Sequence, residues 1–136
     1  MKFDILMKQL KFDQGGLIPA VIQDAKTGQV LMHAYMNRQA LRKTLETGRT
    51  YFWSRSRQAL WLKGESSGHI QSVRGIFLDC DADTLLIKVG QRGAACHSGY
   101  YSCFYRRIDR KSARIKVIGK KAFDPKKVYF NKKHIE

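Results

Sequence analysis

The stretch LIPAVIQDAKTGQVLMHAYM, residues 17–36, decides the fold of this chain. Residues 17–23 and 30–36 are short runs rich in apolar side chains, several of them β-branched, as is typical of β-strands. The polar residues 24–29 lie between them and include Thr27-Gly28, which suits a tight turn. The stretch therefore predicts a β-hairpin that the rest of the fold extends.

The segment after this hairpin predicts a helix over residues 38–47. Asn37 is a typical N-cap and Gly48 a typical stop, while Ala40 and Leu41 supply an apolar face. Runs rich in aromatic or β-branched residues predict further strands at 51–53, 60–62, 73–78 and 84–89. Because strands predominate, we predict an α+β fold that is mostly β, with a mixed or antiparallel sheet and one clear helix.

Length and charge set the broad class of the protein. A chain of 136 residues fits one domain, residues 1–136. The formal net charge is +15, and much of the excess lies in residues 106–136, which we interpret as a basic C-terminal extension. Such a field attracts nucleic acids and small phosphorylated metabolites alike. A solvated basic face is the simpler interpretation of the extension.

The sequence also predicts a compartment. No run approaches the ~20 apolar residues needed to cross a bilayer, and the N-terminus lacks the apolar region of a signal peptide. We therefore expect no membrane association and a cytoplasmic location, where thiols stay reduced. Three cysteines cannot all pair within one chain, so their odd number points to metal binding or chemistry before disulfides.

The acidic stretch 79–83 is the most unusual part of the chain. In an extended strand alternate side chains share a face, so Asp79, Asp81 and Asp83 would project together. Three such carboxylates suit a hard cation such as Mg²⁺. The alternative is an acidic turn that is solvated or paired with Lys and Arg. A calcium EF-hand is excluded, because Thr84 stands where that loop requires glycine.

Cys80, Cys96 and Cys103 form a soft ligand set that suits Zn²⁺. A zinc ion held by only three protein ligands keeps a position open for water, as in catalytic sites. The alternative is three buried, unreactive cysteines, since free cysteine is among the most buried residue types. His97, beside Cys96, is either a proton shuttle near neutral pH or simply a hydrogen-bonding residue.

Two polar segments are candidates for anion binding. Residues 54–57 contain Arg55 and Arg57, whose guanidinium groups can donate twice to a phosphate. Residues 63–68 contain glycine and serine, which leave backbone N–H groups accessible. The alternative is a solvated hairpin tip. The neighbouring aromatic residues would stack on a base or, more commonly, pack in the core.

Several of these motifs together resemble the phosphoribosyl-AMP cyclohydrolase family, over roughly residues 12–107. The motifs are Gly16–Ala20, Met32–Asn37, Tyr51–Arg57, Leu60–Gly68, Leu78–Asp83, Ala95–Gly99 and Ser102–Arg106, and residues 123–129 are similar to the ends of stand-alone members. Three positions depart from the family pattern: Ala94 replaces proline, Ser98 replaces threonine and His69 replaces asparagine. We expect a stand-alone form, without the pyrophosphohydrolase domain that many relatives carry.

The resemblance implies an enzyme of histidine biosynthesis that opens the adenine ring of 1-(5-phosphoribosyl)-AMP between C6 and N1. It implies a homodimer whose zinc ligands come from two subunits, and a bound Mg²⁺ ion. The implied residues are Cys80, Cys96 and Cys103 for zinc; Asp79, Asp81 and Asp83 for magnesium; His97 for proton transfer; and Arg55, Arg57, Lys63, Ser66 and Ser67 for the nucleotide substrate.

Two other functions fit the composition. A basic nucleic-acid-binding module with a structural zinc would explain the charge of +15. It would not explain three aspartates beside a zinc cysteine, so nucleic acid is the less favoured partner. A plain β-rich interaction domain would bind no metal.

Overall fold

The computed structural model describes residues 2–119 and 121. The elements in chain order are α1 (Lys2–Gln9), β1 (Ile18–Asp24), β2 (Val30–Met36), α2 (Arg38–Thr47), β3 (Tyr51–Ser54), β4 (Ala59–Leu62), β5 (Gln71–Leu78), β6 (Leu85–Gln91), β7 (Arg106–Ile108) and β8 (Ile115–Val117). The mostly β fold is confirmed, and so is the first hairpin. No helix within the described residues has the length and apolar character needed to span a membrane.

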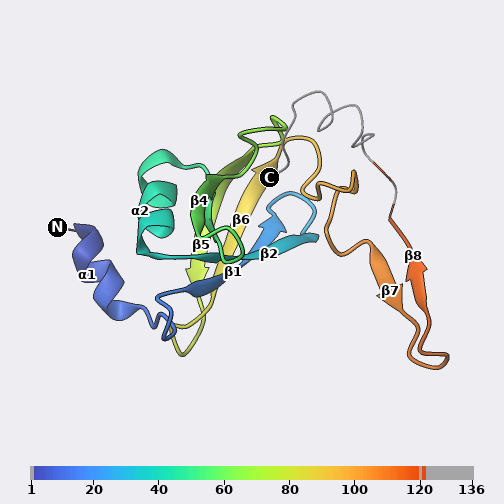
Figure 1. Cartoon of the computed structure of the whole chain (residues 1–136), viewed down its shortest axis with the longest axis horizontal. Helices are drawn as coiled ribbons and strands as arrows, with labels where there is room; N and C mark the ends of the chain where they lie inside the picture. Colours follow the sequence, from blue (N-terminus) through green and yellow to red (C-terminus); the bar gives the residue numbers. More distant parts are fainter. Residues whose placement is uncertain (1, 120, 122–136) are drawn as a thin grey trace.

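The main sheet has the strand order β2-β1-β6-β5. β1 pairs with β2 and β5 pairs with β6 in antiparallel fashion, whereas β1 and β6 run parallel. The predicted mixed sheet is therefore confirmed. β3 and β4 form a separate antiparallel pair, and so do β7 and β8. In Figure 1 the β7–β8 pair projects away from the rest of the molecule.

The core lies where one face of the main sheet meets α2 and β3. Alternate residues of β1 are buried, beginning with Ile18 and including Ile22. Leu41 of α2, Phe52 of β3 and Ile87 of β6 pack into the same cluster. The alternation follows from the strand period of two, which sends every second side chain to the core.

α2 begins and ends where the sequence predicts. The Asn37 side chain accepts a hydrogen bond from the backbone N–H of Ala40 at 2.8 Å, as an N-cap does. Gly48 adopts a left-handed conformation with φ +74° and donates its N–H to the Thr44 carbonyl. Both ends of the helix are therefore satisfied locally.

The structure corrects the prediction of a single helix. α1 has no N-cap signal and no fully buried residue, but Leu6 and Met7 pack against the core. The helix thus gains its support from tertiary contact, which its own short sequence does not reveal.

The predicted basic C-terminal extension, residues 106–136, is described only in part. Its described part contains β7 and β8, while residue 120 and residues 122–136 lie outside the described residues, together with the family-like segment 123–129.

Candidate metal and substrate site

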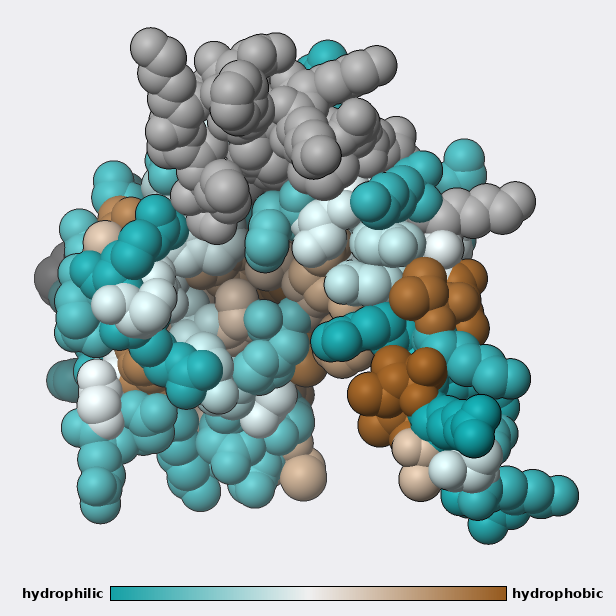
Figure 2. Space-filling model, turned by 45° about the vertical axis from the view of Figure 1, so that its right-hand side comes forward, coloured by the Kyte–Doolittle hydropathy of each residue, from teal (hydrophilic) through white to brown (hydrophobic). Residues whose placement is uncertain are grey.

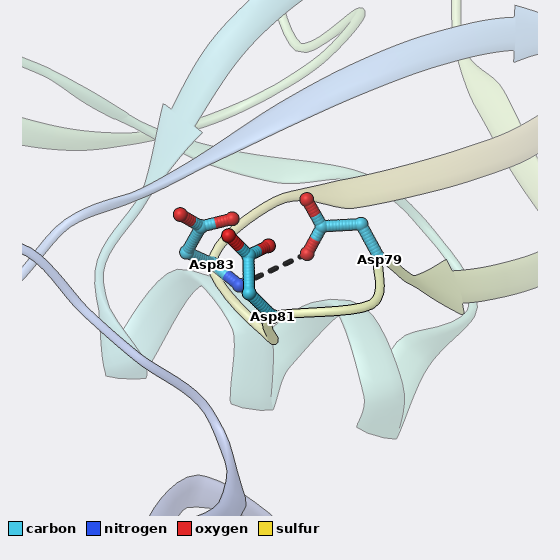
Figure 3. Close-up of side chains that lie close together, drawn as sticks. All are labelled: Asp79, Asp81 and Asp83. Atoms are coloured by element: carbon cyan, nitrogen blue, oxygen red, sulfur yellow. Dashed lines mark hydrogen bonds between the residues drawn. The ribbon is translucent and has the colours of Figure 1, made fainter.

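The three aspartates lie in the turn between β5 and β6, not in a strand as the sequence reading assumed. The Asp79 N–H donates to the Thr84 carbonyl, and the Ala82 N–H donates to the Asp79 carbonyl, both at 3.1 Å. Ala82 takes a left-handed φ of +64°, which turns the chain. The turn still brings oxygens of Asp79, Asp81 and Asp83 within 4.8 Å of one another. Figure 3 shows the three side chains close together on this turn.

The surroundings of this turn favour the charged form of Asp79 and disfavour that of Asp83. Desolvation raises the pKa of Asp79, but the N–H groups of Asp83 and Thr84 donate to its carboxylate and lower the pKa overall. The hydrogen bond shared with Asp81, followed by desolvation and the charge of Asp79, raises the pKa of Asp83. Proximity of like charges is relieved by a proton or a cation, so the oxygen donors fit a divalent ion.

Cys96 and Cys103 lie together in the loop that follows β6. The Cys96 N–H donates to the Tyr100 carbonyl at 3.1 Å, and the Cys103 N–H donates to the Leu31 carbonyl at 2.7 Å. Burial, followed by the neighbouring Cys96, raises the pKa of the Cys103 thiol to about 12, while Lys63 opposes the shift. Two adjacent thiols in this loop are soft donors of the kind that zinc sites use, so they could hold a metal ion.

Cys80 does not join these two cysteines within one chain. It is exposed in the β5–β6 turn, whereas the loop of Cys96 and Cys103 follows the other end of β6. β6 runs over Leu85–Gln91, a span of roughly 20 Å at the rise of an extended strand. The three cysteines of one chain therefore do not surround a single zinc ion.

Lys63 and His69 support the cysteine loop. Lys63 is only 3% exposed, and its ammonium donates to the Ala95 carbonyl at 2.7 Å. The His69 ring lies against Gly93, where an added Cβ would come within 2.6 Å of it, and its Nδ1 accepts the Ala94 N–H at 3.5 Å. The predicted substrate contact Lys63 thus binds the backbone directly before Cys96 and lies close enough to Cys103 to lower its pKa.

The other predicted substrate contacts divide into two groups. Arg55 and Arg57 are exposed at the tip of the β3–β4 hairpin, and the Arg55 guanidinium stacks 4.0 Å from the Tyr35 ring centroid. Ser66 is buried and Ser67 half-buried in the loop at the opposite end of β4. His97 is exposed beside Cys96.

Sequence reasoning missed the contact that holds the cysteine loop to the main sheet. The Tyr101 hydroxyl donates to the buried carboxylate of Asp24, at the end of β1. The same carboxylate accepts the backbone N–H of Lys26 at 2.8 Å in the β1–β2 turn. An aspartate before a turn is a recognisable sequence signal for a turn. Its hydrogen bond with Tyr101 is not, because the two residues lie 77 positions apart in sequence and no local pattern links them.

Comparison with known proteins identifies the family of this chain. The family model described as phosphoribosyl-AMP cyclohydrolase matches residues 32–105, which include the three cysteines and the three aspartates. A phosphoribosyl-AMP cyclohydrolase of Pelotomaculum thermopropionicum is 59% identical over 129 residues, covering 95% of this chain and 98% of the relative. One of Methanococcoides burtonii is 58% identical over 120 residues, covering 88% and 95%.

A third relative carries the same domain in a longer protein. The histidine biosynthesis bifunctional protein HisIE of Thermoanaerobacter pseudethanolicus is 56% identical over 124 residues, which cover 91% of this chain but only 56% of that protein. The family model spans more than half of the chain, and two relatives match over nearly all of their own length. The chain therefore belongs to the phosphoribosyl-AMP cyclohydrolase family.

Proposed function

We propose that this chain hydrolyses 1-(5-phosphoribosyl)-AMP in histidine biosynthesis, as a homodimer that binds zinc at its interface. One observation carries the proposal: the thiols of Cys96 and Cys103 interact in one loop, within the segment that matches the family model. The relatives' names supply the reaction, and membership of the family makes the chain a hydrolase.

The cysteines fit zinc, provided that two chains combine. Cys96 and Cys103 of one protomer supply two soft ligands, and Cys80 of the partner subunit supplies the third, because Cys80 of the same chain lies at the far end of β6. When bound with an open position, zinc acts as a Lewis acid and lowers the pKa of water towards about 7.

The reaction adds water across the C6–N1 bond of the adenine ring. The water oxygen bonds to C6, the C6–N1 bond breaks, and the proton lost by the water is returned to N1. We assign this proton transfer to His97, because it is exposed next to Cys96 and imidazole is a common general acid and base.

We assign phosphate binding to polar side chains that are accessible to solvent. Arg55 and Arg57 offer exposed guanidinium donors, and the Ser67 hydroxyl is half-buried. Lys63 and Ser66 are buried within the single chain. Mutation must therefore distinguish whether they contact the substrate or support the cysteine loop.

Mg²⁺ is proposed on Asp79, Asp81 and Asp83, whose oxygens lie close enough for one ion. Replacing Asp81 with asparagine removes one charge from this set, so we expect Mg²⁺ to bind at least about tenfold more weakly while the cysteine-bound zinc is retained. Isothermal titration with Mg²⁺ and metal analysis measure the two effects, with Asp109→Asn, in a separate turn of the chain, as the control. Equal Mg²⁺ affinity in both variants would remove the aspartates from the proposal.

The function itself is tested on the protein purified without chelator. We expect about one zinc ion per chain and ring opening of phosphoribosyl-AMP, followed by its ultraviolet absorbance. Activity should disappear with a chelator and return with added zinc. Zinc without turnover would instead support the basic nucleic-acid module, and turnover without any zinc would refute the metal mechanism.

A further inference from the structure

The β7–β8 pair, residues 106–117, is called here the arm, and it has two chemically different faces. Residues directly opposite one another in an antiparallel pair share a face. Ile108 pairs with Ile115 and Arg106 pairs with Val117, whereas Arg107 pairs with Lys116 between them. Strand alternation therefore places the three aliphatic side chains on one face and the Arg107–Lys116 pair on the other.

The apolar face of the arm is uncovered in the single chain. Ile108, Ile115 and Val117 are between 59% and 69% exposed, and Phe104 and Ile118 at the base of the arm are equally open. In Figure 2 hydrophobic residues gather on this part of the molecule, which stands apart from the main body. A two-stranded ribbon is not stable in water by itself, and an apolar patch of this kind marks an interaction site.

A second exposed apolar surface lies at the β5–β6 end of the main sheet. Phe77 is 50% exposed and Leu78 is 42% exposed. Val21 and Phe77 both pair with Leu86, so these three residues form one row across the sheet on the face away from the core. They line a hollow of about 300 Å³ that also includes Asp79. The hollow thus borders the turn that carries Cys80 and the aspartates.

The two surfaces are complementary in charge. The arm and the turn at its tip carry Arg106, Arg107, Arg110, Lys111, Arg114 and Lys116, against one carboxylate, Asp109. The β5–β6 turn carries three carboxylates within 4.8 Å of one another. Apolar contact flanked by opposite charges favours a specific pairing of the two surfaces.

We propose that the arm of one protomer packs against the β5–β6 end of a second copy of this chain. Its aliphatic face covers Phe77 and Leu78 of the partner subunit, and its basic residues face the partner's aspartates. The inference rests partly on the proposed function: Cys103 lies three residues before β7, so sharing a zinc ion with the partner's Cys80 brings the arm to that turn. Apolar exposure and charge support it independently.

Complementation between two variants tests this exchange. Ile108→Asp/Ile115→Asp alters the arm, and Phe77→Asp/Leu78→Asp alters the receiving surface. Each variant alone should sediment mainly as a monomer, with dimer affinity reduced at least about 100-fold. Mixed together, they should form a heterodimer, because one of its two arm contacts is unaltered while the other carries both changes. Arg107→Gln is the matched control: it removes one of the six basic residues but leaves the aliphatic face of the arm intact, so this variant should remain mainly dimeric.

Hydrogen exchange of the unaltered full chain supplies a second measurement that does not depend on the variants folding. Amides of residues 106–117 and 77–84 should both become less protected when dilution dissociates the dimer. The inference would be overturned if the arm variants remained dimeric, or if the two folded monomers formed no heterodimer on mixing. It would also be overturned if the hydrogen-exchange protection of residues 106–117 and 77–84 did not depend on protein concentration. An unaltered chain that lacks zinc and turnover yet shows arm-dependent dimers would overturn the proposed function alone.

Discussion

Replacing Cys96 with serine is expected to remove zinc and turnover together. Cys96 is buried beside Cys103, and a serine hydroxyl is a hard, protonated group that binds zinc poorly. The two side chains have similar volumes, and the backbone hydrogen bonds of Cys96 to Tyr100 and Gly99 remain available, so the fold should survive. Metal analysis, turnover and circular dichroism of the same preparation measure the three effects.

The control is Ser98→Ala, two residues further along the same loop, which should keep both zinc and activity. Full turnover by metal-free Cys96→Ser protein would refute the zinc mechanism. An equimolar mixture of Cys80→Ser and Cys96→Ser proteins examines the shared site directly. If the ligands come from two subunits, a mixed dimer contains one intact site, and activity should return to about half of the unaltered level per heterodimer.

Replacing Lys63 with methionine is expected to weaken zinc binding by about 10- to 100-fold, the usual effect of removing a group that orients metal ligands. Lys63 is 3% exposed, donates to the carbonyl of Ala95 and lowers the pKa of Cys103. Methionine fills similar space but provides neither the hydrogen bond nor the charge. The Cys96 loop should then be less well positioned, and its thiols should give up their protons less readily.

Competition with a zinc-binding dye measures the affinity, and KM and kcat are measured with zinc in excess. Arg55→Met is the matched control, because Arg55 is exposed at the β3–β4 tip and stacks on Tyr35. We expect Arg55→Met to raise KM without changing zinc affinity. If Lys63→Met behaves in the same way, Lys63 contacts the substrate and does not support the cysteine loop.

Local signals in the sequence were sufficient for the hairpin and for α2. Asn37 and Gly48 act within one helical turn of the residues that they cap, so their chemistry is visible without the fold. The same locality explains why the aspartates were correctly placed together although the strand interpretation was wrong. Alternate residues remain near one another both in a strand and in this turn, where the left-handed Ala82 changes the chain direction.

The sequence by itself determined the hairpin, α2, the family and the close set of aspartates, because each depends on neighbouring residues or on motifs in order. Only the tertiary structure decided that Lys63 binds the Ala95 carbonyl next to Cys96 and that Tyr101 binds Asp24. It also decided that Cys80 and Cys96 lie beyond opposite ends of β6. These relations join residues far apart in the chain. They depend on sheet order and strand direction, which arise from packing the whole core and not from any local pattern.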